Sequence, residues 1–149
     1  MQRSRATRMA CILAIAIMMT PGCDSTTPKT DEPYSYPTLS PDVLEAGPDA
    51  ALPLLQVPED TLNTMTTSAV LETVLRFPYL VVYSTSSTID GGIDALRAQC
   101  NALDELLQRS DAGEVIRSKF EEVTEQGWPS GTARPELRTG FLRALVETI

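Results

Sequence analysis

The sequence predicts an all-α protein, an irregular multi-helix array or bundle that follows an export signal and a flexible spacer. Three observations lead to this prediction. Apolar residues beyond Pro58 recur at helical spacing, prolines and glycines divide that region into short segments, and no second strand-like segment exists to pair with residues 79–83. Short helices with such joints also suit an α-solenoid fragment, although no repeat of fixed period is visible.

Residues 1–22 have the layout of an export signal. Residues 1–8 contain three arginines and no acid, and an apolar run follows at 9–19. A transmembrane helix would need about 20 apolar residues, so this run is too short to cross a membrane. No Ala-x-Ala-like cleavage site follows it.

Residues 20–23 read Thr-Pro-Gly-Cys and resemble a bacterial lipobox, in which an aliphatic residue and two small residues precede a cysteine. The match holds at Gly22 and Cys23, whereas Thr20 stands where an aliphatic residue is usual. The resemblance implies cleavage before Cys23, a diacylglycerol on its sulfur and an acyl chain such as palmitate on its amine. Each buried CH₂ contributes about 0.8 kcal/mol, so several chains anchor a protein firmly. Plain secretion is the alternative.

The composition after signal cleavage is strongly acidic. The chain has 12 Lys and Arg and 20 Asp and Glu, and loss of the three signal arginines leaves nine basic residues and a net charge of −11. Such a protein is not suited to neutralising phosphates, so nucleic-acid binding is not expected. Of the cysteines, Cys11 leaves with the signal and Cys23 carries the lipid. Cys100 then has no partner, and we expect a small buried hydrophobe rather than a reactive thiol.

Residues 23–53 form the expected spacer. Prolines recur among Ser, Thr, Asp and Glu, and few apolar residues are present to offset the entropy of ordering. An extended segment of this kind, at about 3.1 Å per residue, would hold the helical domain several tens of Å from the bilayer. Tyr34 and Tyr36 are interpreted as ordinary linker residues, with a recognition element as the alternative. The helical domain is expected to cover residues 54–149.

Start and stop signals define the first helices of this domain. Residues 58–60, Pro-Glu-Asp, suit a helix start, because proline needs no donor there and acids favour the positive end of the dipole. Residues 66–68 offer N-caps for a helix that ends before Pro78. Residues 79–83 favour a short buried helical turn or an extended connector.

The second half continues the helical pattern. Asn101 is a candidate N-cap where the next helix restarts, and Asp111 with Glu114 forms a capping box. Gly127 suits the end of that helix and Pro135 the start of the last one. A single apolar stripe of spacing 4, 3, 4 and 3 is formed by Ile89, Ile93, Leu96, Cys100 and Leu103.

Several motifs of this region occur together in a known group of proteins. They are Pro58-Glu59-Asp60-x-Leu62-x-x-Met65-Thr66-Thr67, Leu71-Glu72-Thr73-Val74-Leu75 with Pro78, Gly92-x-Asp94-Ala95-Leu96, Asn101-Ala102-Leu103-x-Glu105-Leu106-Leu107 and Asp111-Ala112. Over residues 54–124 they resemble uncharacterised bacterial exported proteins and lipoproteins. The resemblance implies an all-helical domain and export, but no activity, cofactor or catalytic residue. Many of those proteins are longer, which leaves open whether Ile149 is a natural domain end.

No catalytic constellation can be assembled from the sequence. The chain contains no histidine, which removes Ser-His-Asp and Cys-His systems and the commonest zinc ligand. Asp90 with Asp94 and Glu121 with Glu125 are spaced for acid–base pairs on a helix face, but surface charge is the commoner role of such acids. Trp128 is expected to join two helices, with a partner or glycan contact as the alternative. No cofactor or metal is expected.

The predicted protein is therefore an exported lipoprotein, held by Cys23 at a membrane of the bacterial cell envelope. Its molecular activity is expected to be non-enzymatic, a helical module that contacts an unidentified protein partner. The alternatives are a carboxylate-based enzyme, a small-ligand-binding lipoprotein, or a shortened frame of a longer protein.

Overall fold

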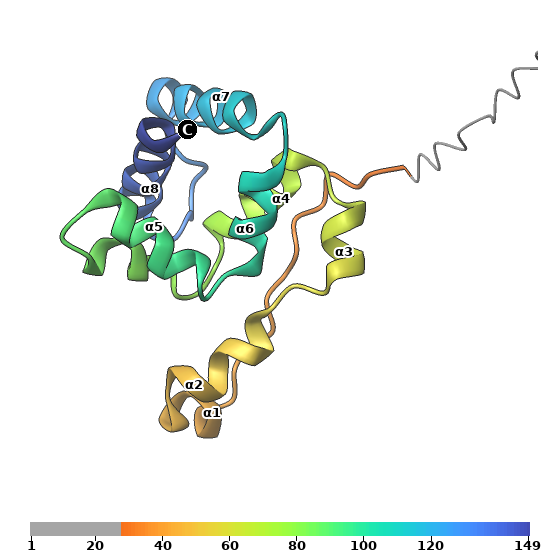
Figure 1. Cartoon of the computed structure of the whole chain (residues 1–149), viewed down its shortest axis with the longest axis vertical. Helices are drawn as coiled ribbons and strands as arrows, with labels where there is room; N and C mark the ends of the chain where they lie inside the picture. Colours follow the sequence, from red (N-terminus) through yellow and green to blue (C-terminus); the bar gives the residue numbers. More distant parts are fainter. Residues whose placement is uncertain (1–27) are drawn as a thin grey trace, which may run out of the picture.

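The computed structural model describes residues 28–149 and confirms the all-α class (Figure 1). The predicted signal, residues 1–22, and the predicted lipidation site, Cys23, lie outside the described residues. Apart from one isolated bridge, residues 28–149 contain no β-strand. The helices are α1 (Pro41–Ala46), α2 (Pro48–Ala51), the 3-10 helix η1 (Leu52–Leu55), α3 (Glu59–Thr64), α4 (Thr67–Leu75), the 3-10 helix η2 (Leu80–Thr85), α5 (Ile89–Arg97), α6 (Asn101–Gln108), α7 (Ala112–Gln126) and α8 (Pro135–Thr148).

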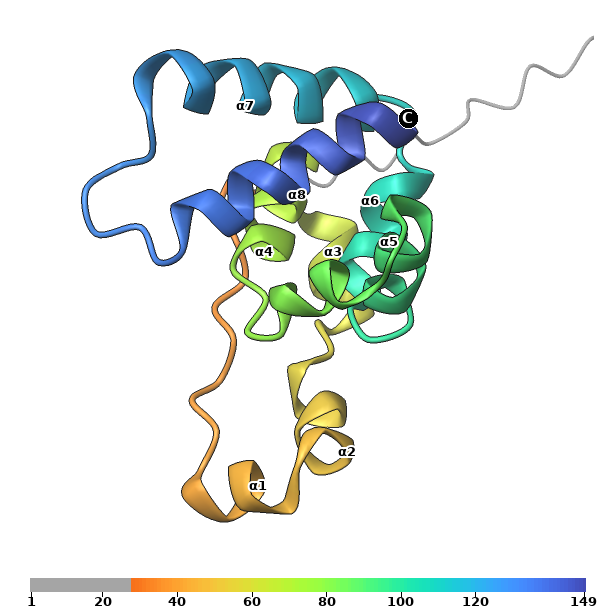
Figure 2. The same cartoon turned by 90° about the vertical axis from the view of Figure 1, so that its left-hand side faces the viewer.

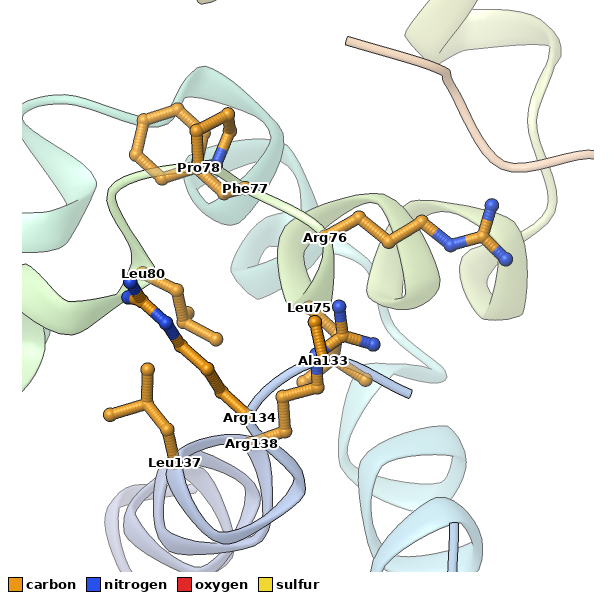
Figure 3. Close-up of a pocket in the computed structure, with 9 residues that line it drawn as sticks. All are labelled: Leu75, Arg76, Phe77, Pro78, Leu80, Ala133, Arg134, Leu137 and Arg138. Atoms are coloured by element: carbon orange, nitrogen blue, oxygen red, sulfur yellow. The ribbon is translucent and has the colours of Figure 1, made fainter. Parts of the chain in front are cut away.

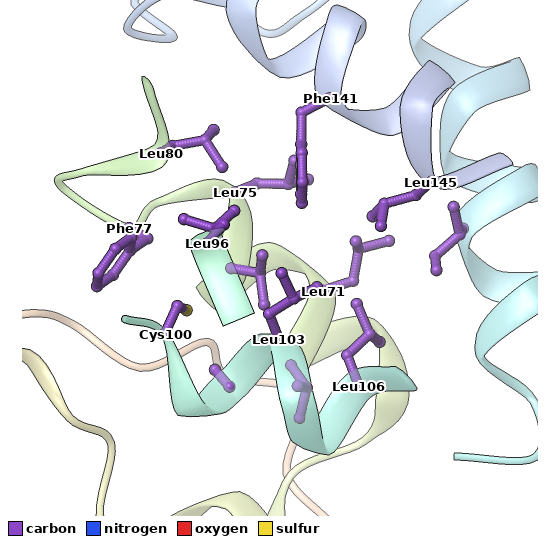
Figure 4. Close-up of a cluster of buried hydrophobic side chains, with 14 of the residues drawn as sticks. Leu71, Leu75, Phe77, Leu80, Leu96, Cys100, Leu103, Leu106, Phe141 and Leu145 are labelled. Atoms are coloured by element: carbon purple, nitrogen blue, oxygen red, sulfur yellow. The ribbon is translucent and has the colours of Figure 1, made fainter. Parts of the chain in front are cut away.

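Helix α4 lies at the centre of the core. Seven of its nine residues are buried, α6 and α7 pack against it, and α8 pairs with α7. Removing apolar area from water contributes about 25 cal/mol per Å², so this helix is a main source of stability. Figure 4 shows apolar side chains of α4, α6 and α8 meeting in this core: Leu71, Leu75, Leu103, Leu106, Phe141 and Leu145.

Most of the predicted helix ends are confirmed. Thr66 caps α4 as expected, its hydroxyl accepting a backbone N–H at 3.2 Å, and Thr88 caps α5 in the same way at 3.2 Å. Pro135 opens α8, and α7 ends at Gly127, whose φ of 76° favours glycine. Residues 79–83 take the helical alternative, because most of them belong to η2.

Two predicted caps are wrong, because tertiary contacts use their side chains. Cys100, and not Asn101, occupies the N-cap position of α6. The Asn101 amide donates to the Val57 carbonyl at 2.8 Å and accepts from the Val57 N–H at 3.0 Å. The Asp111 carboxylate makes no cap bond to α7 but accepts the hydroxyl of buried Thr67 at 2.7 Å. Both side chains therefore join segments that are distant in sequence.

Gly92 lies where α5 passes closest to η2. A β-carbon at this position would stand 3.0 Å from the carbonyl carbon of Tyr83 and closer still to its oxygen. The obstacle is backbone, which cannot rotate aside as a side chain can, so only glycine fits. The glycine serves close packing at a helix start.

The predicted spacer, residues 23–53, differs from the structure in its described part. Residues 30–39, here called the strap, lie along the body rather than away from it. The Thr30 N–H donates to the carbonyl of Thr64 at 2.7 Å, and the Thr30 carbonyl accepts the N–H of Thr66 at 2.9 Å. Packed structure therefore begins well before residue 54.

The tyrosines of the strap explain its position. Tyr36 lies edge-on to Phe77 with the ring centroids 5.6 Å apart, and Tyr34 lies edge-on to Tyr36 at 5.4 Å. The Tyr34 N–H also donates to the hydroxyl of Thr73 at 2.9 Å. The interpretation of these residues as ordinary linker tyrosines is wrong, because the aromatic area that they bury offsets the entropy of ordering the strap.

An arm formed by residues 41–55 connects the strap to α3 and projects from the rest of the molecule (Figures 1 and 2). None of the residues of α1 is buried, and Leu44 and Leu54 are 56% and 51% exposed. Leu55 at the base of the arm is buried in the core. The arm thus contacts the body through η1, whereas α1 lies at its far end (Figure 2).

Arg109 joins α3 to the loop after α6. Its guanidinium donates to the carbonyls of Leu62 and Met65, both at 2.7 Å, and its Nε donates to Glu105 at 2.9 Å. The side chain is only 10% exposed. The Leu62 carbonyl also accepts the N–H of the C-cap residue Met65 at 3.2 Å, so Arg109 gives it a second donor and supplies a donor to the Met65 carbonyl at the end of α3.

Candidate functional site

The acid pairs that the sequence offered for catalysis lie on the surface. Asp90, Asp94, Glu121 and Glu125 are all exposed. The nearest cation to Asp94 is Arg97, with N and O atoms 3.9 Å apart, a distance typical of a weak surface contact. These acids are not gathered in a recess that could hold a substrate.

Cys100 is a buried small hydrophobe, as the sequence predicts. It is 1% exposed, and its Sγ lies 4.0 Å from the hydroxyl of Tyr36. Burial raises the pKa of the Cys100 thiol above its ordinary value, and burial likewise raises the pKa of Tyr36. The thiol therefore stays protonated and is a poor nucleophile.

Trp128 joins α7 to α8, in agreement with the prediction. Its Nε1 donates to the hydroxyl of Thr139 at 2.9 Å, and its ring is partly buried against the core. Two cations lie over the ring, Lys119 Nζ at 5.6 Å and Arg138 Cζ at 5.8 Å from the centroid. The second of these, Arg138, also lines a recess with apolar and cationic walls.

That recess, here called the arginine pocket, has a volume of about 140 Å³. It lies between the end of α4, the segment that leads into η2, and the start of α8 (Figure 3). Its apolar side is formed by Leu75, Leu80 and Leu137. The same pocket is lined by Arg76, Arg134 and Arg138.

The three arginines of the pocket differ in direction. In Figure 3, Arg134 extends toward Leu80 and Arg138 toward Leu75, so that two guanidiniums flank the recess. Arg76 turns its guanidinium away and lines the pocket with the rest of the residue. The pocket is therefore a recess with an apolar floor and two charged sides.

No ion pair neutralises these arginines within residues 28–149. The salt bridges of this range involve Arg97, Arg109, Lys119 and Arg143 instead. Burial lowers the pKa of Arg138, the charge of Glu72 opposes that shift, and the charge of Arg76 adds to it. Because a nearby positive charge and partial desolvation both disfavour the cation, an incoming anion would relieve both effects.

Glu72, the carboxylate whose charge acts on Arg138, already forms an ion pair with another cation. Glu72 pairs with Lys119 at 2.9 Å between Oε1 and Nζ, and both side chains are largely buried. Burial opposes the charged form of Lys119, but its hydrogen bonds to Glu72 and Glu122 leave the pKa of its ammonium raised overall. Glu72 is thus held by an ammonium and does not complete an ion pair with Arg138.

Arg134 holds an uncommon backbone conformation at the edge of the pocket. Its φ of 51° and ψ of 55° place it in the left-handed region, directly before Pro135. That conformation costs a residue with a β-carbon roughly 1–2 kcal/mol. Strained residues concentrate at functional sites, where the surrounding structure maintains them. Here the strain places a guanidinium beside the apolar floor.

No sequence pattern marks this pocket. Arg134 and Arg138 are four residues apart, but Arg134 precedes α8 and does not share its helical spacing, and Arg76 and the floor come from a distant segment. Glu136 lies between the two arginines in sequence, so no local run of positive charge indicated the site. Only the packing of α8 against the end of α4 brings these groups together.

Other features of the described residues do not point to a different chemistry. Within residues 28–149, no group of three or more Cys, Asp or Glu side chains is arranged to hold a metal ion. None of the helices in this range is long and apolar enough to span a bilayer. No family model, curated protein or solved structure matches the chain.

Proposed function

We propose that this chain is a lipoprotein of the bacterial cell envelope, anchored through Cys23, and that its helical body is a non-enzymatic binding module. The observation that carries the binding role is the arginine pocket. The residues that line it offer charge and apolar contact but no nucleophile and no acid–base side chain. Such a recess suits recognition rather than the making or breaking of bonds.

The proposed location at the cell envelope rests on the sequence. A basic start, a short apolar run and the lipobox-like residues 20–23 support export followed by lipidation at Cys23. The resemblance over residues 54–124 to exported proteins and lipoproteins supports the same address.

The docked strap changes the expected distance between this body and the bilayer. Cys23 and Thr30 are seven residues apart, so the chain between them spans at most about 25 Å. A long flexible spacer would have allowed several tens of Å. The strap therefore favours a body held close to the membrane surface, where it can meet partners embedded in the membrane.

Mass spectrometry of the protein recovered from membranes tests the anchor. We expect Cys23 to be the first residue and to carry a diacylglyceryl group and an acyl chain. In cell fractionation, a Cys23→Ser chain exported with an ordinary signal that ends in an Ala-x-Ala cleavage site should move from the membrane to the soluble fraction; the replacement is needed because the chain's own signal offers no such site. Each buried CH₂ contributes about 0.8 kcal/mol, so loss of all chains should release most of the protein.

A matched variant controls for cysteine loss as such. Cys100→Ala removes the buried thiol and should leave the protein with the membranes, because Cys100 lies in the core. A mature chain that begins at another residue, or that begins at Cys23 without fatty chains, would disprove the anchor.

A further inference from the structure

The size of the arginine pocket limits what it can take. A volume of about 140 Å³ is close to that of an engineered apolar cavity that binds benzene, about 150 Å³. Whole small-molecule ligands usually need clefts of about 300–1,000 Å³. The pocket therefore fits one compact apolar group of about six heavy atoms.

The apolar side of the pocket sets the nature of that group. Leu75, Leu80 and Leu137 come from three different elements and provide side-chain carbon around the recess. Leu75 and Leu80 are buried, at 0% and 3% exposure, so this floor is a fixed part of the core, and of the three leucines Leu137 offers most of the surface that an occupant can contact. An aliphatic or aromatic group placed there would be removed from water at little cost in reorganisation.

The charged sides of the pocket define a second requirement. Arg134 and Arg138 flank the floor in Figure 3 and form no ion pair with residues 28–149. The planar guanidinium presents its donors in a fork that matches a carboxylate. A guanidinium that is partly desolvated, as Arg138 is, binds an anion more strongly than one in bulk water. The occupant should therefore carry a negatively charged group next to its apolar group.

We propose that the arginine pocket binds a carboxylate joined directly to a compact aliphatic or aromatic group. The apolar group lies against Leu75, Leu80 and Leu137, and the carboxylate accepts hydrogen bonds from Arg134 and Arg138. Inorganic anions satisfy only the second half of this arrangement, and neutral apolar molecules satisfy only the first.

Two sources supply this chemistry, a free small carboxylic acid and the C-terminal residue of a peptide. In the peptide, the carboxylate and an apolar side chain belong to the same residue, and the preceding chain would leave the pocket along the surface. The inference deepens the proposed binding role but does not use the lipid anchor. The two proposals can therefore fail separately.

Trp128 provides the measurement. It is the single tryptophan of the chain, and the guanidinium of Arg138 lies over its ring, so occupation of the pocket should change its fluorescence. The exported Cys23→Ser chain, which needs no detergent, is titrated with 4-methylpentanoate as the free acid and with N-acetyl-leucine as the peptide end. N-acetyl-leucinamide, acetate and inorganic phosphate are the comparison compounds. Calorimetry of the same titrations gives the affinities.

We expect saturable binding of at least one of the two apolar carboxylates, and binding of each comparison compound at least about tenfold weaker. Tighter binding of N-acetyl-leucine identifies a peptide end as the source, and tighter binding of 4-methylpentanoate identifies a free acid. Equal affinity for the leucinamide, for acetate or for phosphate would overturn the proposal. So would the absence of saturation with both apolar carboxylates.

Variants locate the binding. Arg138→Gln and Arg134→Gly should each lower the affinity for the two apolar carboxylates by about tenfold or more. The glycine variant keeps the left-handed backbone at residue 134 without strain, which protects the fold. Arg143→Gln is the matched control, because Arg143 is on α8 but is exposed and pairs with Glu147. An equal loss of affinity in Arg143→Gln, or unchanged affinity in folded Arg138→Gln, would place the binding elsewhere.

Discussion

The contact between Gly92 and the backbone of Tyr83 leads to a quantitative prediction. In Gly92→Ala, the new β-carbon would stand well inside the 3.0 Å limit that real β-carbons respect, so α5 or η2 would have to move by roughly an ångström. Overpacking of this kind costs about 1–3 kcal/mol, and the upper end applies because the obstacle is backbone. Alanine regains about 1 kcal/mol in helix propensity. We therefore expect a net loss of about 2 kcal/mol in the free energy of unfolding.

Urea unfolding followed by circular dichroism measures this loss as a lower midpoint at an unchanged slope. Gly113→Ala is the matched control, because its β-carbon would meet only the end of the Ile149 side chain, at 3.3 Å. That variant should be neutral or stabilised by up to about 1 kcal/mol. If Gly92→Ala were as stable as Gly113→Ala, the close approach of α5 to η2 would be refuted.

Four further predictions concern buried or partly buried polar groups. In Arg109→Met the Met65 carbonyl loses its donor and the Leu62 carbonyl keeps only the N–H of Met65, so the free energy of unfolding should fall by about 2–3 kcal/mol in a urea titration; a loss below about 0.5 kcal/mol would contradict this. Asn101→Ala removes the partner of both backbone groups of Val57 and should cost about 1–3 kcal/mol by the same measurement, whereas unchanged stability would show that water replaces the amide. Because burial raises the pKa of the Cys100 thiol, the Cys23→Ser chain should react with a thiol reagent at pH 8 much more slowly when folded than in urea, and equal rates would exclude a buried thiol. The same shift predicts that stability is retained below about pH 8.5, the usual thiol pKa, and is lost as the pH rises above it, which unfolding titrations across that range would detect.

Much of the fold follows from local patterns. The caps at Thr66 and Thr88, the proline start of α8 and the glycine end of α7 depend on groups within about four residues of each other. The burial of Cys100 was also predicted, but the single stripe proposed for it is wrong: Cys100 lies at the N-cap of α6, after α5 has ended, and Ile89 at the start of that stripe is 45% exposed.

The candidate site was less predictable. The composition showed that catalysis by a histidine system is impossible, but it could not show where unpaired arginines gather. Asp111 illustrates why. Its position suits a capping box, yet the hydroxyl of Thr67 lies close enough in space to donate a hydrogen bond to its carboxylate. The spacing of residues along the sequence does not show whether a side chain will bind a local partner or a distant one.

By itself, the sequence determined the helical class and most helix boundaries. These properties depend on backbone preference and on the period of apolar residues, which the chain carries locally. Only the tertiary structure decided that the strap docks on α4, that Asn101 holds Val57, that Gly92 meets the backbone of Tyr83, and that Arg134 and Arg138, at the start of α8, flank the leucines beside the end of α4. Those contacts depend on which surfaces meet after folding, and residues distant in sequence become neighbours only when a shared core forms.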